Sequence, residues 1–340
     1  MTDLKSMTIE ELTGFMREIG EKPFRAKQIF KWIHKMHTES FDEMTDISLS
    51  LRERLKETAL LTCIRPVREQ KSRDGTAKYL FELPDGNRIE SVKMDYRHGH
   101  SVCISSQVGC AMGCEFCAST IGGLVRNLTA AEMLDQVYVI EKNNNIKVSN
   151  VVVMGSGEPL QNLKNLLVFL KNINVEEGDN ISLRNITVST CGIVPAMYEL
   201  AEYRLPVTLA VSLHAPSDSI RRQIMPVAKV YPINELMAAC RDYFEITGRR
   251  ISFEYSLMEG VNDSEEQAEE LAMLLKDMNC HVNLINVNPI EEKDFKKTHK
   301  RAIMAFKNIL EKNQINATIR RELGQDIDGA CGQLRRRYPQ

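Results

Sequence analysis

From about residue 100 onward, short apolar runs rich in Val, Ile and Leu alternate with longer amphipathic stretches. The amphipathic stretches predict helices, and two of them begin with a capping-box pattern, Thr129 to Glu132 and Ser264 to Gln267. The apolar runs predict strands at 101–105, 150–154, 185–189, 206–213, 250–257, 281–288 and 317–321. Strands that alternate with helices favour a parallel β/α sheet, either open or curled into a barrel.

The first hundred residues follow a different pattern. Residues 8–60 predict short helices, the first of which has Thr8 as its N-cap. Residues 74–94 predict a β-hairpin around the turn pair Asp85-Gly86. We therefore divide the chain into a helical accessory domain (1–60), a β-hairpin linker region (61–97), a core (98–326) and a C-terminal segment (327–340).

The composition is that of a globular protein with a substantial core: of 340 residues, 43% are apolar and 26% are charged. No apolar run is long enough to cross a bilayer, and the first residues lack the apolar centre of a signal peptide. We therefore expect a cytoplasmic protein with no membrane partner. The formal net charge of −2 gives no support for nucleic-acid binding, but it does not exclude a local basic face.

Four of the nine cysteines lie close together, at Cys103, Cys110, Cys114 and Cys117. The odd number and a reducing compartment argue against a disulfide scaffold. Three thiolates spaced C-x-x-x-C-x-x-C can bind one inorganic centre. A structural zinc ion normally takes four ligands, whereas an iron–sulfur cubane held by three cysteines leaves one iron open to a small molecule. The spacing favours the cluster, with a zinc ion or unliganded thiols as alternatives.

Polar side chains stand where the predicted strands end. They include Ser189, His214 and Asn288, together with the segments 154–160 and 212–214. In a β/α barrel the active site lies at the carboxyl ends of the strands. Each residue has a simpler explanation, such as a turn, a helix cap or a half-buried histidine. Taken together on one rim, they indicate a ligand site.

The octapeptide CAMGCEFC (110–117) resembles the signature of radical S-adenosylmethionine (SAM) enzymes. The resemblance implies that Cys110, Cys114 and Cys117 bind a [4Fe-4S] cluster whose open iron binds the amino and carboxylate groups of SAM. One electron from the cluster then cleaves SAM to methionine and a 5′-deoxyadenosyl radical. For the fold we expect an α/β protein, an incomplete (β/α)6 TIM-type barrel behind the small helical N-terminal domain.

The same resemblance implies a set of SAM contacts. Gly157-Glu158 matches the GE motif, which contacts the amino group, and Ser156 stands where a methionine is commoner. We expect little consequence from that departure, because its neighbours carry the contact. Positions that contact the rest of SAM are matched by Ser189, Ser212, Leu213, His214 and Asn288.

Two further motifs are more specific. The sequences DIDGACGQL around Cys331 and CISSQVGC before the cluster resemble the RlmN/Cfr family of RNA adenosine methyltransferases. The similarity extends from KPFRAKQIFKWI to the C-terminal tail. Gly329 replaces an alanine that is usual in the family, a mild change. By position alone, Cys331 would be an ordinary free cysteine near a C-terminus.

This resemblance implies a mechanism with two thiols, because carbon 2 of adenine is electrophilic and cannot take a methyl group directly from a sulfonium. One SAM methylates Cys331, and a second supplies the radical that removes a hydrogen atom from the S-methyl group. The methylene radical adds to adenine. Attack of Cys103 on the Cys331 sulfur then frees the methylated base and leaves a transient Cys103–Cys331 disulfide.

Glu90 matches the residue proposed in this family as proton acceptor. Without the resemblance, Glu90 would be taken for a solvated strand residue. A carboxylate can take the ring proton only if it reaches the edge of the base. Whether Glu90 or Cys103 removes this proton stays open at the level of the sequence.

The implied substrate is RNA. Residues 21–37 carry five basic residues against one acid, which suits phosphate contacts, although an ordinary helix with Trp32 in the core also fits. An adenosine would be flipped out of a folded RNA into the barrel mouth. Further basic residues that would extend an RNA-binding track are Arg68, Lys71, Arg73, Lys78, Arg320, Arg321 and Arg335–Arg337.

Two branches of the family differ in the carbon they methylate. One acts on carbon 2 of an adenosine in the peptidyl-transferase region of 23S rRNA and of an adenosine beside the tRNA anticodon. The other acts on carbon 8 of the rRNA adenosine and gives antibiotic resistance. GEPL (157–160) and HVNLINVNP (281–289) resemble the carbon-2 branch, with carbon 8 as the alternative.

We further expect an electron donor such as flavodoxin and a monomeric enzyme. Two other classes of function remain open on the sequence alone. One is a zinc-stabilised RNA-binding protein without catalysis. The other is a radical enzyme that acts on a protein partner, which would need neither Cys103 nor Cys331.

Overall fold

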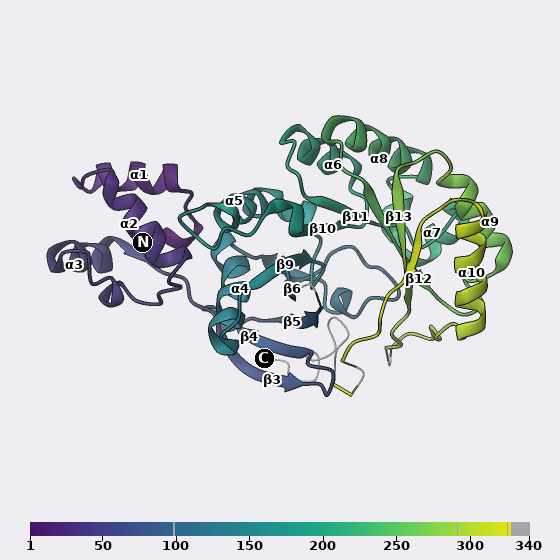
Figure 1. Cartoon of the computed structure of the whole chain (residues 1–340), viewed down its shortest axis with the longest axis horizontal. Helices are drawn as coiled ribbons and strands as arrows, with labels where there is room; N and C mark the ends of the chain where they lie inside the picture. Colours follow the sequence, from purple (N-terminus) through teal and green to yellow (C-terminus); the bar gives the residue numbers. More distant parts are fainter. Residues whose placement is uncertain (98, 291, 325, 328–340) are drawn as a thin grey trace.

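A computed structural model of the chain describes residues 1–97, 99–290, 292–324 and 326–327. One ten-stranded sheet forms its centre, in the order β14-β13-β12-β11-β10-β9-β6-β5-β4-β3 (Figure 1). From β6 to β14 each neighbouring pair is parallel. These strands are β6 (Gly99–Cys103), β9 (Val148–Val153), β10 (Ile186–Thr190), β11 (Thr208–Ser212), β12 (Ile251–Leu257), β13 (Cys280–Asn286) and β14 (Ala317–Ile319).

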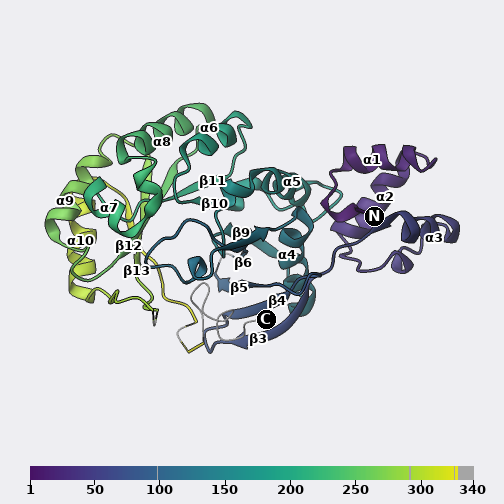
Figure 2. The ribbon, with the colours of Figure 1, turned by 180° about the vertical axis from the view of Figure 1, so that it is seen from behind.

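Helices connect the parallel strands and cover the outer face of the curved sheet (Figure 2). They are α4 (Ala130–Asn144), α5 (Leu163–Asn174), α6 (Val194–Glu202), α7 (Asp218–Ile224), α8 (Ile233–Thr247), α9 (Glu265–Leu274) and α10 (Lys300–Lys312). The predicted capping boxes at Thr129 and Ser264 are both present. In the described chain β3 and β14 remain the unpaired ends of the sheet, so the barrel is incomplete, as predicted.

The predicted hairpin is present and belongs to the central sheet. Its strands β4 (Ala77–Glu82) and β5 (Arg88–Tyr96) pair antiparallel around a turn in which Gly86 has a φ of 82°. A further strand, β3 (Arg65–Lys71), pairs with β4, and β5 pairs with β6. The sequence RPVREQK of β3 is mostly exposed and lacks an apolar alternation, so the pattern did not reveal it.

The N-terminal residues form a small helical unit with its own core. It contains α1 (Ile9–Glu18), α2 (Phe24–His34) and α3 (Leu49–Thr58), and the short strands β1 (Thr2–Asp3) and β2 (Ala59–Leu60). Apolar side chains such as Leu12, Phe30 and Leu55 fill that core. The alternative that placed Trp32 in the core holds in part: Trp32 packs against the core but is only partly buried, and its indole N–H donates to Asp46 at 2.5 Å.

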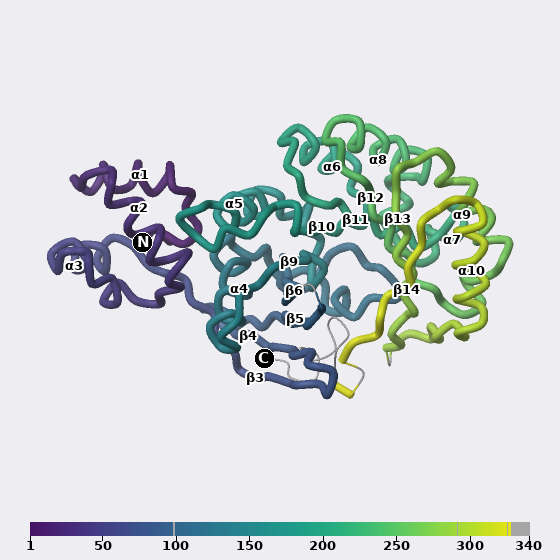
Figure 3. The backbone as a smooth tube through the Cα atoms, viewed as in Figure 1, coloured from purple at the N-terminus to yellow at the C-terminus, as the bar shows by residue number. Residues whose placement is uncertain are grey.

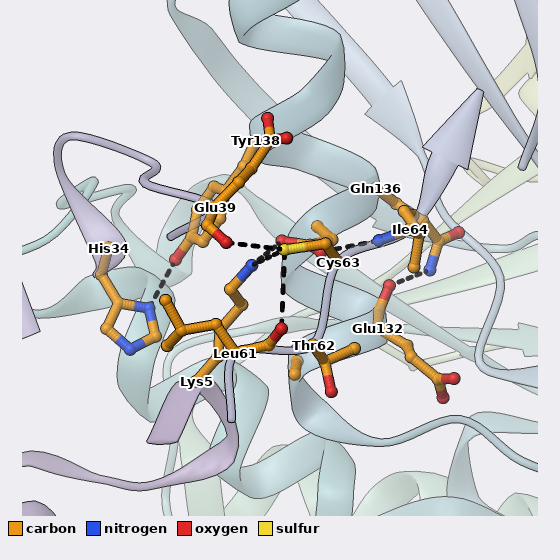
Figure 4. Close-up of polar contacts among 12 residues, drawn as sticks. Lys5, His34, Glu39, Leu61, Thr62, Cys63, Ile64, Glu132, Gln136 and Tyr138 are labelled. Atoms are coloured by element: carbon orange, nitrogen blue, oxygen red, sulfur yellow. Dashed lines mark hydrogen bonds and ion pairs between the residues drawn. The ribbon is translucent and has the colours of Figure 1, made fainter. Parts of the chain in front are cut away.

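Buried polar contacts join the helical unit to α4 (Figure 4). Lys5 and Asp135 form a buried ion pair at 2.6 Å. The other carboxylate oxygen of Asp135 accepts the backbone N–H of Ile64 at 3.1 Å. His34 Nδ1 lies 2.9 Å from the hydroxyl of Tyr138. These contacts fix the helical unit against the core, where it lies beside α4 and α5. No helix of the described residues is both long and apolar enough to span a bilayer.

Candidate active site

The three clustered cysteines lie on a loop that follows β6. A small two-stranded sheet, β7 (Gln107–Gly109) and β8 (Leu124–Asn127), holds the two ends of this loop together. Gly109 has a φ of 80°, and a Cβ there would lie 2.0 Å from the carbonyl oxygen of Gly123. Only glycine therefore allows the two strands to approach at this point.

The thiols of this loop are sheltered from water. Cys110 and Cys114 are buried and Cys117 is half-buried. Burial raises the pKa of Cys110 to about 11, and it raises the pKa of Cys114 and Cys117 as well. The charge of a neighbouring thiolate raises the pKa of Cys110 and of Cys114 further. Three thiolates so placed need a cationic centre to be stable together.

The spacing of the sulfur atoms argues against one metal ion. Within the described chain, one trio of ligand atoms lies within 4.8 Å of one another, and it is His37, Glu141 and Asp179. The three cysteines therefore do not converge on a single point, as a zinc ion would require. A cluster with a separate iron atom for each thiolate fits them better.

The trio of His37, Glu141 and Asp179 is an ion-pair cluster where the helical unit meets the core. His37 Nε2 lies 3.1 Å from Asp179, and the ammonium of Lys147 contacts both carboxylates. Lys147 thus already supplies the positive charge that a metal ion would bring.

Four of the predicted SAM contacts line one cavity of about 210 Å³, together with Cys117 of the cluster loop. These four residues are Ser189, Ser212, His214 and Asn288. They come from the carboxyl ends of β10, β11 and β13, where a parallel β/α sheet places its ligands. The cavity thus joins the cluster loop to the rim predicted from the strand ends.

His214 is a neutral hydrogen-bond donor toward this cavity. Burial lowers its pKa to about 3, so the ring carries no charge at neutral pH. Its Nδ1 accepts the backbone N–H of Ser256 at 2.9 Å, which places the remaining ring proton on Nε2. The residue has a φ of 56°, and its ring meets Phe116 of the cluster loop edge-on at 4.8 Å. The strained backbone is held by the surrounding contacts, which fix the direction of the ring.

The remaining predicted SAM residues support the cavity from behind. Leu213 is fully buried. The carboxylate of Glu158 accepts the backbone N–H groups of Leu160 and Cys191 at 3.0 and 2.7 Å. Gly157 has a φ of 111°, and a Cβ there would lie 2.6 Å from Gln107. Within the described contacts, the Glu158 side chain is committed to the protein, so its backbone is the group left to meet a ligand.

A second cavity, of about 440 Å³, contains the predicted catalytic residues. Cys103 at the end of β6 and Glu90 on β5 both line it. Burial raises the pKa of the Cys103 thiol, and the charges of Arg320 and Lys78 oppose that rise. The two cavities have four residues in common: Met154, Ile285, Asn288 and Arg320. They therefore adjoin, and a ligand in one can reach a ligand in the other.

Cys331 lies outside the described residues, but the chain that leads to it is placed. After β14 this chain crosses toward the β3–β4 turn (Figure 3). The backbone N–H of Gly324 donates to Asp74 at 2.9 Å, and Asp326 accepts the backbone N–H of Arg73 at 3.1 Å. Gly324 and Ile327 both line the larger cavity. Residues 324 and 326–327, which precede Cys331 in the chain, therefore lie at the cavity that contains Cys103.

Comparison with known proteins agrees with this geometry. Residues 2–61 match the model of the ribosomal RNA large subunit methyltransferase N-terminal domain, and residues 104–275 match the radical SAM superfamily. A probable dual-specificity RNA methyltransferase RlmN of Lachnospira eligens is 60% identical over 99% of this chain and 97% of its own length. A second, of Lachnoclostridium phytofermentans, is 56% identical over 99% and 95%. The chain belongs to the RlmN family.

A solved structure supports the same assignment. It is a radical SAM methyltransferase from Sphaerobacter thermophilus, 44% identical, with a TM-score of 0.92 over 98% of this chain and 99% of its own. As an RlmN-family member, the chain is a radical SAM RNA methyltransferase that uses a [4Fe-4S] cluster and SAM. This excludes a zinc-stabilised RNA-binding protein and a radical enzyme that acts on a protein partner.

The residues around the loop fit a negatively charged cluster. Arg221 is fully buried behind Cys114 and Cys191, and its charge opposes the rise in the pKa of both thiols. Its Nε and Nη2 donate to backbone carbonyls, whereas Nη1 is buried and has no hydrogen-bond partner among the described residues. Such a cation is expensive to bury unless an anionic group lies nearby. When bound, the cluster and SAM supply a carbon radical that can remove a hydrogen atom.

One member of the predicted RNA-binding track is misplaced. Lys78 was expected at the surface, but it is fully buried and pairs with Glu90. The prediction was wrong because the residues next to Lys78 in β4 do not show which face of the sheet the rest of the chain covers. The solvated alternative for Glu90 fails for the same reason, since Glu90 is also buried. Arg335–Arg337 lie outside the described residues.

Sequence reasoning missed the place of three charged residues near the site: Arg221, which is buried, Glu254, which lines the smaller cavity, and Lys78, which pairs with Glu90. Glu254 stands beside Ser256 on β12, and burial raises the pKa of its carboxyl group. Only its position in a strand that ends at the active-site rim could have indicated it.

Proposed function

We propose that this chain methylates carbon 2 of an adenosine in the peptidyl-transferase region of 23S rRNA and of an adenosine beside the tRNA anticodon. The observation that carries the proposal is the adjoining pair of cavities. One holds the predicted SAM residues and Cys117, and the other holds Cys103, Glu90 and the chain that leads to Cys331. A SAM-binding site thus opens directly onto a site with a thiol and a carboxylate.

In the proposed reaction Cys331 carries the methyl group as S-methylcysteine. Ile327 lines the larger cavity, and the four residues from there to Cys331 reach at most about 14 Å when extended. Because Ile327 itself lines the larger cavity, the proposal places the Cys331 sulfur there. Two SAM molecules are used per turnover, one to methylate Cys331 and one as the source of the radical.

The release of the product needs a proton acceptor and a nucleophile. Glu90 takes the proton from carbon 2 of the ring, and the unpaired electron of the adduct would pass to the oxidised cluster held by Cys110, Cys114 and Cys117. The Cys103 thiolate then attacks the Cys331 sulfur, so that the S–S bond forms and the S–CH2 bond breaks with its electron pair on carbon. That carbon takes up a proton and becomes the methyl group. The resulting disulfide must be reduced by an external dithiol before the next turnover.

RNA contacts are proposed on the basic side of α2. Lys22, Lys27, Lys31 and Lys35 are exposed there, and Arg68, Lys71 and Arg73 are exposed on and after β3. Backbone phosphates would fix the RNA on these cations while one adenosine is turned into the larger cavity. A cytoplasmic location, a monomeric state, a flavodoxin-type electron donor and the division into 1–60, 61–97, 98–326 and 327–340 complete the proposal.

The test is mass spectrometry of nucleosides from rRNA and tRNA treated with the reconstituted protein. We expect 2-methyladenosine in both RNAs, and none with the Cys331→Ala variant. Formation of 8-methyladenosine would overturn the assignment of carbon 2. Methylation of RNA by Cys331→Ala would overturn the two-thiol mechanism.

A further inference from the structure

Lys78 and Glu90 form an ion pair inside the protein. The ammonium nitrogen lies 2.9 Å from Glu90 Oε2, and the two side chains are 0% and 3% exposed. In the register of the β4–β5 pair, Lys78 is opposite Val92, and Leu80 is opposite Glu90. Lys78 and Glu90 are therefore diagonal neighbours on one face of the sheet, which is the face of the larger cavity.

The position of Glu90 is fixed from two sides. Its carbonyl oxygen accepts the hydroxyl of Ser105 at 2.7 Å, which ties its backbone to the chain after β6. The next residue, Ser91, donates to Gln136 of α4 at 2.8 Å. These bonds hold the backbone, and the ammonium of Lys78 holds the carboxylate.

A buried ion pair is weak support for stability. Taking both charges out of water costs several kcal/mol, and apolar residues of similar size are often no less stable in that place. A buried ion pair whose carboxylate lines the same cavity as Cys103 is therefore more easily explained by chemistry. Both also act on the Cys103 thiol: Lys78 lowers its pKa and Glu90 raises it.

We propose that Lys78 is a positioning residue that acts through Glu90: its ammonium holds the carboxylate in place and directed at the adenine ring. Lys78 does not contact RNA, because it is fully enclosed. The inference rests on the proposed function, in which Glu90 takes the ring proton. Methylation of Cys331 by SAM involves no adenine and does not need this pair.

The experiment compares Lys78→Met, Lys78→Arg, Glu90→Gln and the double variant Lys78→Met/Glu90→Gln. Two steps are measured for each: methylation of Cys331, by the mass of the protein, and methylation of saturating RNA in one turnover. We expect Lys78→Met to lose about tenfold to a hundredfold in RNA methylation with Cys331 methylation within about twofold of wild type. Lys78→Arg should restore most of the loss, because it restores the charge.

The double variant decides whether Lys78 acts through Glu90. If it does, the double variant is no slower than Glu90→Gln alone, since the carboxylate that Lys78 holds is already absent. If the loss of RNA methylation in the double variant equals the product of the losses in the two single variants, the proposal is overturned. It is also overturned if Lys78→Met loses Cys331 methylation as much as RNA methylation. The double variant leaves no unpaired buried charge, so it keeps the test available if Lys78→Met alone fails to fold.

Lys93→Met is the matched control. Lys93 is a buried lysine on β5 that pairs with Asp95 at 2.8 Å, and it does not line the cavity. Its loss should lower stability without slowing RNA methylation at saturating RNA. A wild-type rate in Glu90→Gln would overturn the role of Glu90 and with it this inference. Absence of 2-methyladenosine from the wild-type reaction would instead overturn the proposed function.

Discussion

Arg320 and Cys103 line the same cavity although they lie far apart in the sequence, and the guanidinium of Arg320 is the main charge that favours the Cys103 thiolate. Burial acts in the opposite direction and raises the pKa of this thiol. The attack of Cys103 on a second sulfur needs the thiolate. In the proposed reaction, the cation after β14 would therefore favour the attack by Cys103 at the end of β6.

Replacement of Arg320 by methionine should make Cys103 less reactive. Without the cation its pKa rises further, so less thiolate is present at a given pH. We expect alkylation of Cys103 by iodoacetamide at pH 8 to be about threefold to tenfold slower than in wild type. The rate is measured by mass spectrometry of the peptide that contains Cys103. Arg321→Met is the control, because Arg321 lines the cavity without being a major influence on this thiol. Equal rates in wild type and Arg320→Met would contradict the role of Arg320.

Replacement of Cys114 by alanine should abolish the cluster. One of three thiolate ligands is lost, and the other two do not hold a cubane. After anaerobic reconstitution we expect iron and sulfide in wild type, with a broad absorption band near the visible range, and neither in Cys114→Ala. Cys240→Ala is the control, since Cys240 is a buried cysteine in α8 away from the loop. One zinc and no iron in wild type would show the cluster assignment to be wrong.

Replacement of Gly109 by alanine should also prevent cluster binding while leaving all three cysteines in place. The new methyl group would meet the carbonyl of Gly123, and the positive φ adds further strain. We expect a loss of about 2–4 kcal/mol in the free energy of unfolding and a deficit of iron. Gly14→Ala in α1 is the matched change: nothing lies within 4 Å of its Cβ, and alanine favours a helix by about 0.5–1 kcal/mol. A full iron content in Gly109→Ala would refute this account of the loop.

Acid should loosen the contact between the helical unit and the core. Burial lowers the pKa of His34 to about 3, whereas the unfolded chain protonates this ring near 6.5. The neutral ring therefore contributes stability above about pH 6.5, and that contribution is lost as the pH falls toward 3. Urea unfolding at pH 7 and pH 5 should show wild type losing up to about 1.4 kcal/mol per pH unit from this group.

The matched variants for that measurement are His34→Gln and His299→Gln. The first removes the titrating ring and should reduce the loss of stability between pH 7 and pH 5. The second removes a histidine whose side chain is 86% exposed, and it should leave the loss unchanged. The same loss in wild type and His34→Gln would mean that other groups govern the acid response.

Much of the fold was predictable because its signals are local. Each parallel strand is a short apolar run, and the helices between them begin with capping residues that the sequence displays. The predictions for the cluster cysteines, Cys103, Ser189 and Asn288 rest on motifs and strand ends, which also leave a local trace. Lys78 and Arg221 leave none: their environment is set by residues from distant segments that pack over them.

Lys78, the ion-pair partner of Glu90, illustrates the same limit. The Asp85-Gly86 turn predicts that β4 and β5 pair, and the register follows from it. The turn does not show which face of the β4–β5 pair meets the cavity. That face is decided by the pairing of β5 with β6 and by the path of the chain after β14. Polar residues in such a pair look solvated until the whole sheet is assembled.

The sheet ends at β3 on one side and β14 on the other, and residues 320–324 run along the gap between them to Asp74. The position of residue 324 is therefore set by the turn between β3 and β4. An insertion or deletion in that turn would move residues 320–324, and with them the part of the cavity wall that they form. In the proposed reaction, the shape of the cavity that receives the nucleotide and the starting point of the segment that carries Cys331 would change together, so evolution could alter one only with a compensating change in the other.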